Sequence, residues 1–234
     1  MYSDAFCKVY NEFGWNYFPE AFGEQLLQWM EENDLKLRYC LDLACGTGVL
    51  CRVLKDAGME PRGMDFSEGM IAIARQENPD IPFDVADMIL YRPEQRFDLV
   101  TCTGDALNHI LDIGDVGRIF GNVSGCLKEG GWFVFDLLNE KEISTEEPFD
   151  LDYSDTVKAR FQMVREGSGV CLRTTVYENG VPTVREEIRE TVHDVQVICS
   201  LLEKNGLRVV KCGHSLPASA PREAATWFII ARKG

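Results

Sequence analysis

The sequence predicts a doubly wound α/β fold, with helices on both faces of a mostly parallel sheet, plus a small inserted antiparallel sheet. Short apolar runs alternate with helix-like segments between residues 36 and 140. These runs are apolar on both faces, as strands are when helices cover both sides of a parallel sheet. After residue 155 the pattern changes to polar–apolar alternation between turn residues, which is typical of antiparallel strands.

The first 140 residues supply most of the expected elements. Residues 1–35 are predicted to be helical, because the run 18–32 places Phe22, Leu26, Leu27 and Met30 on one face. Strands are expected at residues 39–43, 60–64, 83–85, 97–103 and 132–138. Helices are expected at residues 49–57, from an N-cap at Ser67, and at residues 116–127.

The remaining residues predict an insertion followed by the end of the main sheet. Residues 140–155 hold seven acidic residues and one lysine, which indicates an exposed connector. Residues 156–191 predict three antiparallel strands with turns at 167–169 and 178–180. Asp194 is the expected cap of the next helix, and strands at 207–211 and 225–231 bring the main sheet to seven. We therefore expect residues 1–140 and 192–234 to form the main domain and residues 141–191 an inserted lid.

Composition restricts the classes of partner. The formal net charge is −14 without any run of Lys or Arg, so neither nucleic acid nor an anionic membrane surface is an expected partner. No apolar stretch is long enough to span a bilayer, and the N-terminal residues do not resemble a signal peptide, so we expect a cytoplasmic protein. Nine cysteines without a C-x-x-C pair indicate reduced thiols, and three widely separated histidines predict no metal site. A monomer or a homodimer is expected.

A glycine-rich turn at residues 41–48 follows the first predicted strand and opens a helix. Glycines in such a turn let a ligand approach the backbone closely. The dinucleotide pattern G-x-G-x-x-G would place its third glycine at Cys51, so a pyrophosphate is less favoured here. Asp42, at the end of the strand, suits a ligand that carries an ammonium group.

Two further aspartates follow the next strands. Asp65 stands 19 residues after Gly46, where a carboxylate can accept hydrogen bonds from both hydroxyls of a ribose. Asp87 can accept a hydrogen bond from an adenine amino group. A ribose occurs in both NAD and S-adenosylmethionine, so Asp65 alone leaves both cofactors open.

Taken together, these motifs resemble the class I S-adenosylmethionine-dependent methyltransferases over nearly the whole chain. The resemblance implies a Rossmann-like, mostly parallel seven-stranded sheet and S-adenosylmethionine as the cofactor. Residues 41–48 resemble the first family motif, 63–70 the second, 86–88 the adenine-contact segment, and 97–102 the fourth strand. The cofactor-binding residues that it implies are Asp42, Ala44, Cys45, Gly46, Gly48, Asp65, Phe66, Met70, Ala86, Asp87, Met88 and Cys102.

A narrower resemblance is to bacterial small-molecule methyltransferases that begin with an F-A-x-x-Y-D helix and carry a small β-sheet after the fifth strand. Here the helix reads Phe6-Cys7-Lys8-Val9-Tyr10-Asn11, with Asn11 in place of the usual aspartate. The resemblance implies that Tyr10 and Tyr17 close over the cofactor and that Arg222 faces the pocket. It also implies a small-molecule acceptor.

Methyl transfer from a sulfonium is an in-line displacement, which needs alignment and exclusion of water more than a particular catalytic side chain. Residues 103–109 are expected beside the methyl group, with Asn108 in the substrate pocket and His109 as a candidate base. Their sequence is neither an Asn/Asp-Pro-Pro motif nor a Pro-Cys motif, which counts against adenine and cytosine C5 methylation. His109 also fits a simple packing role. An NAD(P)-dependent oxidoreductase, an RNA or protein methyltransferase, and a non-enzymatic binding module remain alternatives.

The predicted insertion has two possible roles. Ligands of open α/β sheets bind beyond the carboxyl ends of the strands, and the insertion begins at such an end. It is therefore placed to form a lid or an acceptor pocket, or alternatively a dimer surface. The acidic residues of the connector would attract a cationic acceptor such as an amine, although such runs are commonly just solvated.

Overall fold

A computed structural model describes residues 3–139, 147–167, 169–217 and 225–234. Strands of the larger sheet are β1 (Tyr39–Leu43), β2 (Glu60–Asp65), β3 (Phe83–Val85), β4 (Phe97–Cys102), β5 (Leu127–Leu138), β10 (Leu207–Gly213) and β11 (Thr226–Lys233). The smaller sheet comprises β6 (Phe149–Asp152), β7 (Val157–Glu166), β8 (Gly169–Glu178) and β9 (Val181–Thr191). The helices are α1 (Asp4–Val9), α2 (Tyr17–Glu32), α3 (Val49–Asp56), α4 (Glu68–Glu77), the 3₁₀ helix η1 (Ala106–His109), α5 (Ile113–Cys126) and α6 (Val195–Lys204).

The strand order of the larger sheet is β10-β11-β5-β4-β1-β2-β3. Strands β1 to β5 pair in parallel, and β11 runs antiparallel to both of its neighbours. Because β1 pairs with both β2 and β4, the chain changes direction across the sheet between β1 and β4. Ligands of open α/β sheets bind at such a reversal, outside the carboxyl ends of the strands. The predicted mostly parallel, seven-stranded α/β fold is confirmed.

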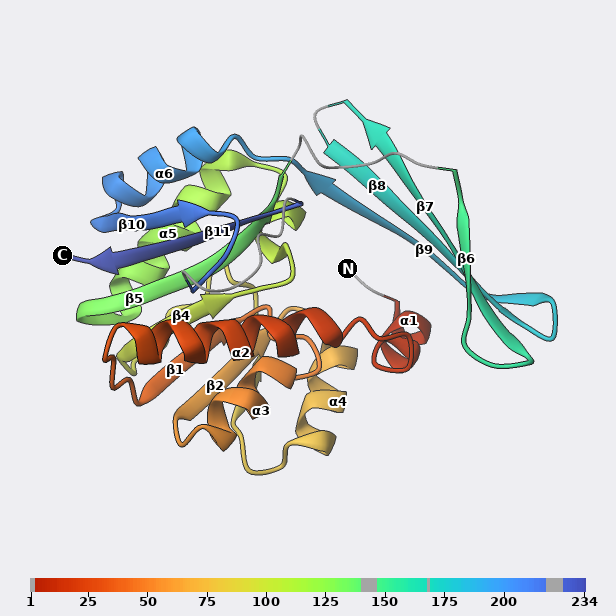
Figure 1. Ribbon diagram of the computed structural model, residues 1–234, viewed down its shortest axis with the longest axis horizontal. Coiled ribbons are helices and arrows are strands. Elements are labelled where there is room, and N and C mark those ends of the chain that lie inside the picture. The colour runs from red at the N-terminus through yellow and green to blue at the C-terminus, as the bar shows by residue number, and fades with distance from the viewer. Residues whose placement is uncertain (1–2, 140–146, 168, 218–224) are drawn as a thin grey trace.

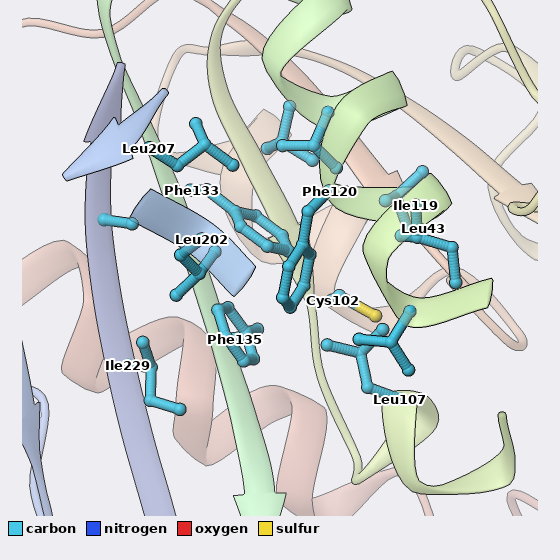
Figure 2. Close-up of a cluster of buried hydrophobic side chains, with 14 of the residues drawn as sticks. Leu43, Cys102, Leu107, Ile119, Phe120, Phe133, Phe135, Leu202, Leu207 and Ile229 are labelled. Carbon is cyan, nitrogen blue, oxygen red and sulfur yellow. The ribbon is translucent and has the colours of Figure 1, made fainter. Parts of the chain in front are cut away.

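Helices cover both faces of this sheet, and each face has its own apolar core (Figure 1). On one face, Phe120 of α5 packs on Phe133 and Phe135 of β5, with ring centroids 5.9 and 5.8 Å apart (Figure 2). On the other face, α2 and α3 bury Phe22, Leu26, Leu50 and Leu54. Successive residues of a strand point to opposite faces, so strands covered on both sides must be apolar throughout.

The smaller sheet extends beyond the carboxyl ends of the larger one, with α1 lying between the two (Figure 1). Phe6 and Phe13 of the N-terminal segment are buried in one cluster with Ala159, Phe161 and Ile188 of this sheet. Apolar burial on this scale stabilises the contact by about 1.5–3 kcal/mol for each large side chain. The N-terminal segment is therefore held against the smaller sheet.

The smaller sheet has four strands where the sequence pattern predicted three. The additional strand is β6, which lies within the stretch predicted to be an exposed connector and pairs antiparallel with β7. Phe149 of β6 stacks on Phe161 of β7 with ring centroids 5.4 Å apart. The acidic residues of β6 are exposed, so the strand resembled a solvated run in the sequence.

The predicted helix N-caps are confirmed. Ser67 accepts a hydrogen bond from the Met70 amide, and Asp194 accepts from the Gln196 and Val197 amides. The predicted turn before β9 is also present, with Asn179 and Gly180 both at positive φ, as the tight turn of a two-residue hairpin requires. Within the described residues, no helix combines the length and the apolar character needed to cross a membrane.

Candidate cofactor and acceptor site

A cavity of about 540 Å³ opens at the carboxyl ends of β1 to β4. This volume suits a small organic ligand, for which pockets of about 300–1,000 Å³ are usual. Its walls come from the loops that follow these four strands, from the N-terminal segment and from β9. The lining includes Tyr10, Asp42, Ala44, Cys45, Gly46, Asp65, Phe66, Ala86, Asp87, Met88, Thr103 and His109, and from β9 Glu187, Ile188 and Arg189.

The loop after β1 has an unusual backbone. Ala44, Gly46 and Gly48 all have positive φ, at 55°, 52° and 82°. A Cβ at Gly48 would also lie 2.8 Å from Cζ of Phe83, too close for any side chain. A Cβ at Gly46 would meet nothing within 4 Å, so that glycine is required by its left-handed backbone and not by crowding. The loop can therefore present bare backbone to the cavity.

Asp65 links the end of β2 to this loop. Its carboxylate accepts hydrogen bonds from the Gly46 amide over 3.0 Å and from the Ser67 amide over 2.8 Å. Burial raises the pKa of Asp65, while these backbone hydrogen bonds oppose the increase. The two amides thus fix the orientation of a carboxylate that borders the cavity.

Asp42 lies deeper and is 1% exposed. Its Oδ1 accepts a hydrogen bond from Thr101 Oγ1 over 2.7 Å, and Cys51 Sγ lies 3.8 Å from Oδ2. Burial raises the pKa of Asp42 to about 7, although the hydrogen bonds from Thr101 and Cys51 oppose the shift. Among the residues that the structure describes, no Lys or Arg pairs with Asp42, and a buried carboxylate in this state favours a positively charged ligand.

Asp87 follows β3 and borders the same cavity. Its Oδ1 accepts a hydrogen bond from the Ile89 amide over 2.8 Å, which turns the chain there. Ala86 and Met88 line the cavity on either side of it and pack against the main core. The segment therefore combines an acceptor group with apolar surface, as recognition of an adenine ring requires.

The two predicted tyrosines occupy different environments. Tyr10 lines the cavity and packs its ring against Phe6 and Trp15, with centroids 6.1 and 5.8 Å away. Burial raises the pKa of the Tyr10 hydroxyl. Tyr17, in the first turn of α2, is 74% exposed and lies outside the cavity lining, where Asn16 and Pro19 stand instead.

Four other predicted site residues lie behind the cavity wall. Met70 and Cys102 are buried, and Gly48 lies against the ring of Phe83. Asn108 is also buried, and its Nδ2 donates to the Thr191 carbonyl over 2.7 Å. Its Oδ1 accepts from the Leu138 amide over 3.2 Å, so Asn108 ties η1 to the ends of β5 and β9. Arg222 lies outside the described residues.

Comparisons with known proteins agree with this geometry. A family model described as a methyltransferase domain matches residues 40–131. The chain is 31% identical over 159 residues to YqeM of Bacillus subtilis, whose assignment as a methyltransferase is itself provisional, and 33% identical over 119 residues to the ubiquinone biosynthesis O-methyltransferase of Coxiella burnetii. These alignments cover 66% and 48% of this chain.

Solved structures share the fold over nearly the full length. A S-adenosylmethionine-dependent methyltransferase from Clostridium acetobutylicum superposes with a TM-score of 0.80 at 23% identity, covering 91% of this chain and 90% of that one. CalS10, an amino pentose methyltransferase from Micromonospora echinaspora, gives a TM-score of 0.76 at 17% identity, covering 100% of this chain and 98% of that one. Residues 40–131 belong to the methyltransferase-domain family, and the chain has the fold of the class I S-adenosylmethionine-dependent methyltransferases.

Membership in this family confirms the predicted cofactor, S-adenosylmethionine. The matches do not establish which reaction this chain catalyses, because the alignments span only 62% of the Bacillus relative and 49% of the Coxiella relative. The structures at this level of identity establish the fold and leave the acceptor open.

Next to the part of the cavity lined by Thr103, Gly104 and His109 lie buried acidic residues that the sequence motifs did not indicate. Asp136, at 2% exposure, accepts hydrogen bonds from the amides of Gly104 and Asp105 over 2.9 and 2.8 Å. These bonds hold Asp105 at a φ of 49°, a conformation that few residues other than glycine adopt. Burial, with Glu190 and Asp136 nearby, raises the pKa of Asp105 well above its usual range.

His109 ends η1 and lines the cavity. Burial lowers the pKa of His109 to about 4, so the ring is neutral at physiological pH. Its Nε2 lies 3.8 Å from Asp105 Oδ1, too far for a hydrogen bond. Burial also raises the pKa of the neighbouring Glu190 to about 7. The sequence motifs indicated His109 here but not Asp136 or Glu190; the one available signal for Asp136 was its position near the end of a predicted strand.

Proposed function

We propose that this chain transfers the methyl group of S-adenosylmethionine to a nitrogen or oxygen atom of a small molecule. The observation that carries the proposal is a single cavity that joins the cofactor loops of the larger sheet to charged residues of β9. Such a cavity has room for both a cofactor and an acceptor to meet. A protein that bound the cofactor without catalysing a reaction would not need the additional cavity wall that β9 provides.

The residues present fit S-adenosylmethionine. Asp65 would hold the ribose hydroxyls, Asp87 would accept from the adenine amino group, and buried Asp42 would balance the positive charge of the methionine part. Thr103 adds a further observation, because its buried Oγ1 has no hydrogen-bond partner among the residues that the structure describes, although Thr103 lines the cavity. A buried hydroxyl in that state favours a ligand that pairs with it.

The bound cofactor supplies a methyl group on a positively charged sulfur, which is already activated for displacement. The chain's own residues then align the acceptor and exclude water. Tyr10 and Ile188 cover the cavity from the N-terminal segment and from β9. His109 is placed to take a proton from an acceptor hydroxyl or amine, if the acceptor must lose one.

A small acceptor is favoured by the shape and charge of the chain. Residues 141–191 act in this proposal as a lid whose strand β9 brings Glu187 and Arg189 to the cavity. The net charge of −14 disfavours RNA as the acceptor. The names of two relatives point the same way, since one acts in ubiquinone biosynthesis and another on an amino pentose. The protein would act in the cytoplasm as a monomer or a homodimer.

An NAD(P)-dependent oxidoreductase is the main alternative. Its G-x-G-x-x-G pattern needs a third glycine, which lets the helix pack closely on the strand. There Cys51 is fully buried and packs with Ile71 and Ala74. A buried side chain at this position departs from the dinucleotide pattern, which favours the methyl-transfer proposal.

The test is a binding titration with S-adenosylmethionine, S-adenosylhomocysteine and NADH. It would use the native protein, Asp65→Ala and, as a matched control, Asp56→Ala, whose exposed carboxylate pairs with Arg52 on α3. We expect both adenosyl ligands to bind the native protein and the control, and to bind Asp65→Ala much more weakly. Binding of NADH alone would overturn the proposal. A screen of small amines and hydroxylated metabolites would then identify the acceptor.

A further inference from the structure

We propose that Asp105, His109 and Glu190 form a binding site for one divalent transition-metal ion, at the part of the cavity that His109 lines. The three side chains each offer one ligand atom, and these atoms lie within 4.8 Å of one another. With both carboxylates ionised, as metal binding requires, and the imidazole neutral, the three groups carry a charge of −2, which matches a divalent ion. No sequence spacing suggested this site, because the ligands come from η1 and from a distant strand.

The distances suit a metal ion better than direct contacts between the three groups. His109 Nε2 and Asp105 Oδ1 are 3.8 Å apart, longer than a hydrogen bond. Two ligands that each lie about 2.1 Å from a metal ion are separated by up to about 4.2 Å. Adjustments of less than about 1 Å would therefore bring all three ligands into the first coordination sphere.

Glu190 provides an independent observation. Its side chain is 8% exposed, and within the described residues its carboxylate accepts no hydrogen bond and pairs with no Lys or Arg. A buried carboxylate without a partner is costly, and such groups usually coordinate metals or form ion pairs. Its ligand oxygen faces Asp105 and His109, and these two groups provide no positive charge while the histidine is neutral.

The surrounding backbone fixes all three ligands in place. Asp136 holds the Asp105 amide, and Asn108 binds the Thr191 carbonyl next to Glu190. The His109 ring also hydrogen-bonds the backbone of Arg189, the other neighbour of Glu190. Metal-binding histidines commonly hydrogen-bond a backbone carbonyl through one ring nitrogen, which orients the ring. The positions are thus set by contacts outside the three ligands themselves.

The ligand set also limits the metal. Two carboxylates with one imidazole suit Mn²⁺, Fe²⁺ or Zn²⁺. His109 lines the cavity, whereas Asp105 and Glu190 stand behind it, so the ion would border the space in which an acceptor binds. This part of the inference rests on the proposed function. The binding of the metal itself does not.

The test uses Mn²⁺ as the probe on untagged protein that has first been treated with a chelator. Mn²⁺ avoids thiols, which matters because the side chains of Cys199 and Cys212 lie within hydrogen-bond distance of each other at the surface and could bind Zn²⁺. Electron paramagnetic resonance of free Mn²⁺ would count the bound ions. We expect one ion per chain, and binding at least about tenfold weaker in Glu190→Gln and in His109→Ala.

Glu187→Gln is the matched control, because Glu187 lies on the same strand but pairs with Arg173 and Arg189. It should bind Mn²⁺ as the native protein does. Thermal unfolding of every variant, with and without Mn²⁺, would show which variants are folded. If Glu190→Gln does not fold, the Mn²⁺ affinity of His109→Ala tests the proposal. No saturable binding up to about 1 mM, the weak end of protein sites for divalent ions, would overturn the proposal. Equal affinity in the ligand variants and the native protein would overturn it as well. Both readouts are independent of methyl transfer.

Discussion

The backbone amide of Asp105 donates a 2.8 Å hydrogen bond to the buried carboxylate of Asp136, whose other oxygen accepts from Gly104. The carboxylate at the end of β5 thereby holds two consecutive residues in left-handed conformations after β4. Neighbouring parallel strands end at the same edge of the sheet, so each can support the loop of the other. The position of Asp105 is therefore set by a residue 31 positions away in the sequence.

Asp136→Asn is predicted to lower the free energy of unfolding by about 1–3 kcal/mol, because the amide nitrogen of Asn would face a backbone donor. Asp112→Asn is the control, since Asp112 caps α5 through a single bond to the Gly114 amide, and Asn caps helices equally well. Denaturant unfolding of both variants would measure the difference. Equal stability of the two variants would show that Asp136 does not hold the loop.

Asp42 is predicted to make stability depend on pH. Its pKa rises from 3.8 to about 7 on folding because burial penalises the charged form. The folded state therefore binds the proton more tightly, so this contribution to stability is complete below pH 3.8 and is lost as pH rises through about 7. Three pKa units correspond to roughly 4 kcal/mol.

Asp42→Asn removes this titration. Relative to the native protein, the variant should gain stability as the pH increases from about 4 to about 7, which denaturant unfolding at several pH values would measure. The carboxylate of Asp65 adds to the shift, so Asp65→Asn should reduce the dependence slightly. Curves for the native protein and Asp42→Asn that run parallel would contradict the prediction.

Gly48→Ala should destabilise the fold more than Gly58→Ala. Both glycines have positive φ, at 82° and 86°, so both substitutions introduce backbone strain of about 1–2 kcal/mol. Only at Gly48 would the new Cβ also collide with Phe83, at 2.8 Å, and overpacking of this kind costs about 1–3 kcal/mol more. Thermal and denaturant unfolding would compare the variants. A similar loss in both would mean that Phe83 moves aside easily.

The cofactor half of the site could be predicted from the sequence because it depends on local patterns and on one topological rule. Each strand ends where its apolar run ends, and β1 and β2 are parallel neighbours with Asp42 opposite Gly63. Asp65 therefore reaches the loop that contains Gly46. The prediction needed no knowledge of how separate layers pack.

The meeting of residues 103–109 with the smaller sheet could not be predicted in this way. Asp105 and Glu190 meet only because the smaller sheet returns to the carboxyl ends of the larger one, and its orientation depends on packing against Phe6 and Phe13. No periodicity in the sequence encodes that orientation. The strand β6 was missed for a related reason, since its pairing with β7 places acidic side chains at the surface, where they resemble a loop.

Tyr10→Ala is predicted to weaken the binding of S-adenosylmethionine and S-adenosylhomocysteine by at least about tenfold, equivalent to 1.4 kcal/mol. Tyr10 forms part of the cavity wall, and its loss would admit water to the ligand. Tyr17→Ala is the control, because the sequence motif placed both tyrosines over the cofactor but Tyr17 is 74% exposed. Calorimetric titration would compare them. An equal effect of the two substitutions would require α2 to move toward the cavity on binding.

His109→Ala is predicted to lower turnover without weakening the binding of S-adenosylhomocysteine. Its pKa of about 4 makes the neutral ring a weak base at physiological pH, so the loss of kcat should lie near the lower end for general bases, about hundredfold. His214→Ala, which alters a histidine outside the cavity lining, should leave kcat unchanged. The measurement requires an acceptor from the screen and compares kcat with the cofactor dissociation constant. Unchanged turnover in His109→Ala would remove this histidine from the mechanism and leave alignment of the acceptor as the main contribution of the chain.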